Sequence, residues 1–269
     1  MKTALTIAGS DSCGGAGIQA DLKTFTILNV QGMTAITAVT AQNTLGVKDV
    51  VEIEPAMVKA QIDAVAGDIQ VDACKTGMLA NARLVDVVAD AIAAHKLVPY
   101  VCDPVMFAKS GDRLLKEDAI DAVRRRLLPL ASVITPNRRE AALLAGTTVD
   151  ALTTIAAARD AAQRLVRAGA KAVVIKGIRV GEQVVDVFHD GEQFLEFAAG
   201  ALANEKTHGS GCVFSAAITA GLANRLPLVQ AVDQAKQVVT MAIQYSDGQG
   251  RGTAAVNVLA YAPKSPKKG

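Results

Sequence analysis

The sequence predicts an α/β fold in which helices cover both faces of a mostly parallel central sheet, and three observations support this prediction. Short apolar runs alternate along the chain with stretches of helical period, which is the pattern of strand–helix–strand units. Glycine and small polar residues follow the apolar runs, as expected where buried strands end. Of the 269 residues, 51% are hydrophobic and 20% are charged, so the chain can bury a sizeable core.

The expected strands are short apolar runs that end in glycine or in polar residues. The run 4–9 ends in glycine, and the alternating run 33–41 ends before Gln42. A hairpin is expected around Asp190-Gly191, because this turn dipeptide separates two apolar runs. The full set of expected strands is 4–9, 33–41, 47–53, 71–75, 98–102, 131–134, 172–175, 184–189 and 193–198.

The expected helices are stretches in which apolar residues recur every three or four positions. Ile18, Leu22, Phe25 and Leu28 show this spacing. Pro55 stands at the first position of the next helix, where a missing N–H is tolerated. The full set of expected helices is 18–28, 55–66, 81–94, 117–127, 154–168, 213–224 and 228–245.

Composition argues against several classes of protein. A formal net charge of +2 and only 3% aromatic residues disfavour nucleic-acid binding. No apolar run is long enough to span a membrane, and the first one is too short for a signal peptide, so we expect a cytoplasmic protein. The four cysteines are far apart, which fits neither a zinc knuckle nor a disulfide framework. Because no linker interrupts the chain, we expect one domain over 1–262 and a disordered basic tail over 263–269.

Polar side chains follow the ends of several expected strands, and that edge of an open α/β sheet is where ligands bind. Asp103 and Glu140 could hold Mg²⁺, which prefers oxygen ligands. Lys176 could neutralise phosphates. Each has a plainer interpretation: Asp103 could start a turn, Asn137 and Glu140 could form a helix capping box, and Lys176 could be a solvated strand end.

The loop 207–212 directly precedes an alanine-rich helix and predicts an anion site. Gly209 and Gly211 allow a tight turn whose amides, with those of Ser210, point at an anion near the positive end of the helix dipole. Cys212 lies in the first helical turn, where this field is expected to lower the pKa of the thiol. A glycine-containing loop with a buried cysteine is the plainer alternative.

These parts together favour phosphoryl transfer, which depends on positioning and charge neutralisation. The sequence contains neither a P-loop nor the signature segments of a protein kinase. A nicotinamide site is disfavoured because the glycines at 14, 15 and 17 lack the dinucleotide-binding spacing. The glycine-containing loop 108–113 is either a lid over the site or an ordinary connection.

Six segments, in order, resemble the hydroxymethylpyrimidine/phosphomethylpyrimidine kinases of thiamine biosynthesis, which belong to the ribokinase-like superfamily. The resemblance implies a homodimeric ribokinase-like enzyme that uses ATP and Mg²⁺. It further implies phosphorylation of the hydroxymethyl group of 4-amino-5-hydroxymethyl-2-methylpyrimidine and then of its monophosphate. The segments are AGSDSCGGAGIQADLKTF (8–25), TAVTAQNTLGV (37–47), KTGML (75–79), DPVMFAKSGDRLL (103–115), TPNRREA (135–141) and THGSGC (207–212).

The resemblance also implies a role for individual residues. Cys212 corresponds to the cysteine that replaces the aspartate base of most ribokinase-like enzymes, within the catalytic loop of Gly209 and Gly211. Gln42 corresponds to the glutamine that recognises the aminopyrimidine. The other implied assignments are Gly9, Asp21 and Met78 to the substrate pocket, Asp103 and Glu140 to the metal, and Lys176, Asn137 and Ser210 to ATP and phosphate.

Three segments depart from the family pattern. Lys176-Gly177-Ile178-Arg179 and the stretch 250–257 differ where nucleotide contacts are expected, and Cys13 stands where serine or glycine is usual. A cysteine-type pyridoxal kinase of the same superfamily is the alternative function. A non-catalytic pyrimidine-binding protein is a more distant alternative, because such a protein would lose the acids or the glycine loop.

Overall fold

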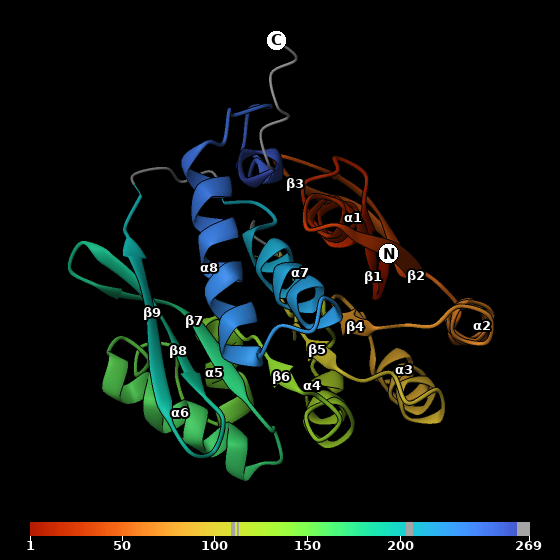
Figure 1. Ribbon diagram of the computed structural model, residues 1–269, viewed down its shortest axis with the longest axis horizontal. Coiled ribbons are helices and arrows are strands. Elements are labelled where there is room, and N and C mark those ends of the chain that lie inside the picture. Colours follow the sequence, from red (N-terminus) through yellow and green to blue (C-terminus); the bar gives the residue numbers. More distant parts are fainter. Residues whose placement is uncertain (109–110, 112, 203–206, 263–269) are drawn as a thin grey trace.

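A computed structural model describes residues 1–108, 111, 113–202 and 207–262, and the predicted tail 263–269 lies outside them. In this described part, nine strands form one sheet in the order β3-β2-β1-β4-β5-β6-β7-β8-β9 (Figure 1). The bounds of the strands are β1 Lys2–Asp11, β2 Val30–Asn43, β3 Gly46–Glu52, β4 Ala73–Thr76, β5 Tyr100–Cys102, β6 Val133–Ile134, β7 Val173–Val180, β8 Gln183–His189 and β9 Phe194–Gly200.

The sheet is mostly parallel. Strands β2, β1, β4, β5, β6 and β7 pair in parallel, whereas β3 is antiparallel to β2 and β8 is antiparallel to both β7 and β9. The helices that flank it are α1 Gly17–Ile27, α2 Pro55–Ala66, α3 Ala82–Ala94, α4 Ala119–Ala122, α5 Arg138–Ala145, α6 Ile155–Arg167, α7 Ser210–Ala223 and α8 Leu228–Gln244, with a π-helical turn at Val123–Leu127 and a 3-10 turn at Val258–Tyr261.

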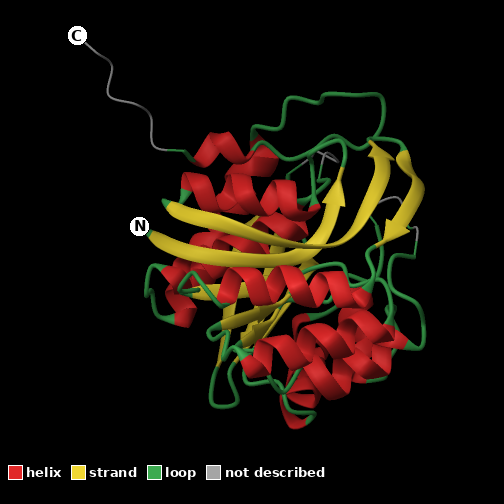
Figure 2. Cartoon of the chain, turned by 90° about the vertical axis from the view of Figure 1, so that its right-hand side faces the viewer, coloured by secondary structure: helices red, strands yellow, loops and turns green. Residues whose placement is uncertain are grey.

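Two apolar clusters, one on each face of the sheet, form the core. Helices α1, α7 and α8 pack on one face, where Phe25, Phe214 and Val232 are buried. Helices α2 to α6 cover the other face, where Ile62 and Leu84 are buried. Figure 2 shows the strands layered between these helices. The predicted α/β architecture is therefore confirmed. None of the described helices is long and apolar enough to span a membrane.

The connections leaving β1 and β4 create a crevice at the carboxyl end of the sheet. β1 lies between β2 and β4. The chain leaves β1 toward α1 on one face and leaves β4 toward α3 on the opposite face. Ligand sites of open α/β sheets lie at such a switch point, outside the carboxyl ends of the strands.

Two local predictions were incomplete. The run 172–175 does not end at Lys176, because β7 continues to Val180 through an irregularity between Ile175 and Ile178. Gly177 adopts a φ of +83° there, which lets the strand bulge and resume its pairing with β8. The second difference is α5, a helix of eight residues that follows β6 directly.

Candidate active site

All twelve residues predicted for the site line a cavity of about 630 Å³ at the carboxyl edge of the sheet. Sheet order arranges them: Gln42 ends the parallel strand β2 at one side, Asp103 follows β5, and Lys176 lies on β7 toward the other side. The role of each residue stays a prediction, but their common placement is a property of the fold. The twelve are Gly9, Asp21, Gln42, Met78, Asp103, Asn137, Glu140, Lys176, Gly209, Ser210, Gly211 and Cys212.

The glycine loop forms the N-terminus of α7. Gly209 is the N-cap residue with a φ of +80°, and the helix begins at Ser210. A Cβ atom at position 209 would lie 1.8 Å from the carbonyl oxygen of Gly15, so this position accepts glycine alone. At Gly211 a Cβ would lie 3.5 Å from Lys176 Nζ, which places that ammonium group beside the start of the helix. The helix N-terminus and the lysine thus form one positively charged corner of the cavity.

A fully buried ion pair lies at the base of the cavity. Lys75 Nζ donates to Asp21 Oδ1 at 2.7 Å, and neither side chain is exposed. Thr6 Oγ1 donates to the other carboxylate oxygen of Asp21 at 2.6 Å. Burial alone would lower the pKa of Lys75, but the negative charge of Asp21 and the hydrogen bond to its carboxylate outweigh burial and raise that pKa. Lys75 therefore stays cationic under Cys212.

The expected lowering of the Cys212 pKa is wrong. Burial raises the pKa of this thiol to about 12, and the negative charges of Asp21 and Asp103 add to the effect. Lys75 acts in the opposite direction without offsetting the burial. The helix dipole that motivated the expectation is present, but desolvation of a thiolate at this half-buried position on the cavity wall is the larger effect. Cys212 is a neutral thiol at physiological pH.

Asp103 lies at the centre of a hydrogen-bonded group. Its Oδ1 accepts from Lys176 Nζ and from Thr135 Oγ1, both at 3.1 Å, and its Oδ2 accepts from Ser215 Oγ at 3.0 Å. The side chain of Asp103 is only 2% exposed, whereas that of Lys176 is 14% exposed. Asp103 is therefore more than the start of a turn, and Lys176 is not a solvated strand end.

Asn137 and Glu140 form the capping box that was the plainer interpretation, and both also line the cavity. Asn137 Oδ1 accepts from the Glu140 amide at 3.0 Å, and Glu140 Oε2 accepts from the Asn137 amide at 2.9 Å. Burial raises the pKa of Glu140 to about 7; Lys176 lowers it and Asp103 raises it. Burial is thus the main reason that Glu140 resists ionisation, and the negative charge of Asp103 adds to it. A divalent cation bound by both acids would stabilise the ionised form of Glu140.

Gln42, Gly9 and Met78 form the other end of the cavity. Gln42 Oε1 accepts from Thr40 Oγ1 at 3.2 Å, and its amide nitrogen lies 3.4 Å from His208 Nε2. A Cβ at Gly9 would lie 3.3 Å from the sulfur of Met78, so the absence of a side chain there leaves room for the ligand. This end combines an uncharged amide with an apolar wall.

The sequence did not indicate a second polar group, Lys236 with Asp186, which holds the backbone next to Lys176. Lys236, on α8, donates to Asp186 Oδ2 and to the carbonyl of Val184, both at 3.0 Å. Asp186 Oδ1 accepts from the Gly177 amide at 2.8 Å. The bulge from which Lys176 reaches Asp103 is therefore held by α8, a helix about sixty residues further along the chain. No local pattern in the sequence indicates this contact.

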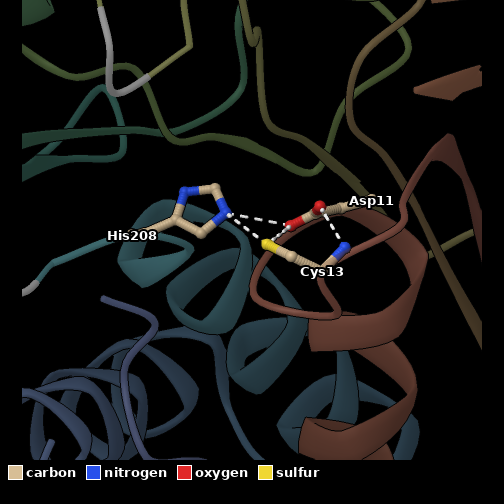
Figure 3. Close-up of side chains that lie close together, drawn as sticks. All are labelled: Asp11, Cys13 and His208. Carbon is tan, nitrogen blue, oxygen red and sulfur yellow. Dashed lines mark hydrogen bonds and ion pairs between the residues drawn. The ribbon is translucent and has the colours of Figure 1, made fainter. Parts of the chain in front are cut away.

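Sequence reasoning also missed Lys75 and the contact between Asp11 and His208. Lys75 ends the apolar run of β4, and a lysine inside a buried strand could have been recognised as a paired charge. Asp11 Oδ2 lies 2.9 Å from His208 Nε2 (Figure 3). The same oxygen accepts from the amides of Gly15 and Ala16. Burial would raise the pKa of Asp11, but hydrogen bonds from His208 and Cys13 lower it to about 2.

Three of the six residues of the loop 108–113 lie outside the described residues, so its role as a lid stays a prediction. Its flanks meet, because Phe107 and Arg113 form an isolated β-bridge. Arg139 stacks over the ring of Phe107 with its guanidinium carbon 3.4 Å from the ring centroid. Phe107 and Arg139 line the cavity together with Asp103 and Glu140.

Comparison with known proteins supports the resemblance drawn from the six segments. Residues 11–257 match the family model described as phosphomethylpyrimidine kinase. A hydroxymethylpyrimidine/phosphomethylpyrimidine kinase of Rhizobium meliloti is 47% identical over 254 residues, covering 93% of this chain and 94% of the relative.

Solved structures have the same fold. The pyridoxal kinase of Staphylococcus aureus in complex with AMP-PCP and pyridoxal matches with a TM-score of 0.89 and 34% identity, over 97% of this chain and 94% of that one. The phosphomethylpyrimidine kinase of Clostridium difficile 630 matches with a TM-score of 0.80 and 37% identity, over 90% of this chain and all of that one. By motifs, fold and overall identity, this chain belongs to the phosphomethylpyrimidine kinase family.

Proposed function

We propose that this protein transfers the γ-phosphate of ATP to the hydroxymethyl group of 4-amino-5-hydroxymethyl-2-methylpyrimidine and then phosphorylates the resulting monophosphate. The observation that supports this most directly is the arrangement of the cavity. One end of the cavity, with the Gln42 amide and Met78, and the other end, with Lys176 and two acids, lie on either side of the N-terminus of α7. We assign the first end to the pyrimidine and the second, the phosphate end, to the phosphates. Helix α7 packs against β1, β4 and β5, between the two ends.

Different residues of the cavity would bind the pyrimidine, bind the transferred phosphate and position the substrate hydroxyl. The Gln42 amide, which both donates and accepts, orients the aminopyrimidine edge, with Met78 as an apolar wall. The amides at the start of α7 and the Lys176 ammonium group bind the transferred phosphate and neutralise its growing charge. Cys212, over the Lys75–Asp21 pair, lies where the substrate hydroxyl would be held for attack.

Nucleotide and metal complete the proposal. AMP-PCP in the complex of the Staphylococcus aureus relative supports ATP as the phosphate donor. Asp103 and Glu140 would hold Mg²⁺ directly or through water, and the ion would supply charge neutralisation and alignment of the phosphates. Asp103 also forms the ion pair with Lys176, so that this one carboxylate would position both the Lys176 ammonium group and Mg²⁺.

A homodimer is part of the proposal and is supported by an apolar stripe on the edge of the sheet. Val39 and Val51 are direct cross-strand partners on β2 and β3, and they are 46% and 62% exposed. Leu45 and Met57 nearby are 59% and 57% exposed. Apolar side chains paired on an exposed edge favour a second copy of the same edge across a two-fold axis.

The substrate assignment is tested by comparing ATP consumption with the hydroxymethylpyrimidine, its monophosphate and pyridoxal. We expect both pyrimidines to be preferred. The change Gln42→Leu should weaken pyrimidine binding by about 1–3 kcal/mol, because it leaves polar ligand atoms unpaired, and should leave the KM for ATP unchanged. Gln31→Leu, an exposed glutamine at the start of β2, serves as the control. A higher kcat/KM for pyridoxal than for either pyrimidine would contradict the proposal.

The role of Cys212 is tested by rate and pH together. Cys212→Ala should lower kcat by about 10²- to 10⁴-fold, the range for one general base, with little change in KM. Because the pKa of this thiol is about 12, the fraction of thiolate grows with pH. The kcat of the unmodified protein at saturating Mg²⁺ should therefore rise through neutral and mildly alkaline pH without a plateau. Cys212→Asp should recover part of the activity and remove this rise, since its carboxylate is already ionised.

Cys13→Ser removes a thiol outside the cavity and is the matched control for both cysteine changes. It should keep the rate and the pH profile of the unmodified protein. If Cys212→Ala keeps a normal kcat, the thiol only packs against the start of α7, and the amides and the cations perform the catalysis.

The assignment of Glu140 to the metal predicts a Mg²⁺ requirement that depends on pH. The pKa of this carboxyl is raised to about 7, so it is protonated below that pH and ionised above it. The Mg²⁺ concentration for half-maximal activity should fall as pH rises through about 7, because the ionised form binds the cation. Glu140→Gln, which keeps an oxygen for the helix cap, should raise the requirement and abolish its pH dependence. Glu192→Gln, at an exposed hairpin acid, should change neither. A wild-type pH profile in Glu140→Gln would remove this residue from the metal site.

The dimer is tested at its apolar stripe. Val51→Lys places like charges opposite each other across the two-fold axis, so sedimentation analysis should show a monomer where the unmodified protein shows a dimer. Val180→Lys, which changes a 43% exposed valine on β7, should leave the dimer intact. An unmodified protein that sediments as a monomer at all concentrations would contradict the proposal.

A further inference from the structure

Three different metal-binding groups converge where the loop after β1 meets the loop before α7. They are the Asp11 carboxylate, the Cys13 thiol and the His208 imidazole, shown in Figure 3. Asp11 Oδ2 lies 2.9 Å from His208 Nε2 and 3.4 Å from Cys13 Sγ, and Cys13 Sγ lies 3.8 Å from His208 Nε2. None of the three is among the residues assigned above to substrate, ATP or Mg²⁺.

These separations match the edges of a tetrahedral coordination sphere. Zinc binds sulfur at about 2.3 Å and nitrogen or oxygen at about 2.0–2.2 Å, so donor atoms on one tetrahedral ion lie roughly 3.3–3.6 Å apart. The three observed distances bracket that range. A single ion could reach all three atoms after side-chain movements of a few tenths of an ångström.

Backbone contacts hold the group in place and leave it open on one side. Asp11 accepts from the amides of Cys13, Gly15 and Ala16 at 2.8–3.1 Å, an outer shell of the kind that orients metal-ligating carboxylates. The strand-like pairing with the segment around Ala255 holds the backbone of His208 in place. Asp11 and His208 are buried, whereas Cys13 is exposed, so an ion has a path from solvent.

We propose that Asp11, Cys13 and His208 bind one thiophilic divalent cation of the Zn²⁺ class at the pyrimidine end of the cavity. On binding, the thiol proton of Cys13 is released to solvent and His208 takes the tautomer with its hydrogen on Nδ1, so that Sγ, Nε2 and Asp11 Oδ2 can all coordinate the ion. Water or the side chain of Gln42 completes the sphere. A set of one oxygen, one nitrogen and one sulfur donor suits Zn²⁺ or Co²⁺ and not Mg²⁺, which prefers oxygen ligands. The site is thus chemically distinct from the acids assigned to Mg²⁺.

The test measures metal binding directly and does not depend on the proposed reaction. Equilibrium dialysis of the full chain against Zn²⁺ alone should give one ion per chain. Titration with Co²⁺ should give a thiolate-to-cobalt charge-transfer band and the visible absorption of a tetrahedral ion. Cys13→Ser should remove the charge-transfer band and weaken Zn²⁺ binding by at least about 10- to 100-fold, since loss of an outer-shell partner already costs that much.

His95→Gln provides the matched control. His95 Nε2 lies 2.8 Å from Asp63 Oδ1, which makes a second histidine–aspartate pair without a thiol near it among the described residues. This variant should bind Zn²⁺ like the unmodified protein. Thermal unfolding of both variants checks that they fold. Equal Zn²⁺ affinity of the Cys13→Ser and unmodified proteins, or a Co²⁺ complex without a charge-transfer band, would overturn the proposal.

A second readout rests on the proposed kinase function. Because Gln42 lies 3.4 Å from His208, an ion here should compete with the pyrimidine, and Zn²⁺ added at saturating Mg²⁺ should lower kcat/KM for the pyrimidine. Cys13→Ser should resist this inhibition while its activity without Zn²⁺ is unchanged. Equal inhibition of both proteins would place the inhibitory ion elsewhere, for example on ATP, and would overturn the competition. A protein without kinase activity would instead contradict the proposed function and leave the dialysis result standing.

Discussion

The buried ion pair of Lys75 and Asp21 is the contact around which the cavity is built. It joins β4 to α1, and Thr6 of β1 donates to the same carboxylate. Both side chains are fully buried, so removing one would leave an uncompensated charge at a cost of about 3–5 kcal/mol. The pair therefore fixes three neighbouring elements under the start of α7 and presents a permanent positive charge to Cys212.

Two loops almost 200 residues apart together shape the corner of the cavity at the start of α7. Gly209 approaches the backbone of Gly15 so closely that no side chain fits between them, and His208 contacts Asp11 from the same loop. The conformation of the glycine loop before α7 is thus set by the N-terminal segment as much as by its own sequence. This mutual dependence also brings Cys13 beside His208, which gives the chain a set of donors for a soft metal ion next to its substrate pocket.

The residues at the phosphate end of the cavity also depend on contacts with distant segments. Lys176 is directed by a bulge at Gly177, and the bulge is held through Asp186 by Lys236 of α8. Glu140 caps α5 and at the same time lines the cavity, where the charge of Asp103 adds to burial in raising its pKa. From the sequence alone, the helix capping box and the ligand site are alternative interpretations of Glu140. In the folded protein the same side chain caps α5 and lines the cavity.

The sequence by itself predicted the architecture and a set of twelve residues that lie together along one cavity. Apolar periodicity and glycine positions are local properties, so the alternation of strands and helices could be predicted from them. The residues after the strand ends could be predicted to meet because parallel strands end at one edge.

Only the tertiary structure decided the protonation of these groups and their partners. The pKa of Cys212 depends on how completely distant segments exclude water from it, and burial there outweighs the helix dipole that its local sequence indicates. The partners of Lys75 and Lys236 were also decided by the tertiary structure, because Asp21 lies 54 positions from Lys75 and Asp186 lies 50 positions from Lys236 along the chain. Desolvation and long-range pairing are properties of the packed chain, so no local pattern in the sequence encodes them.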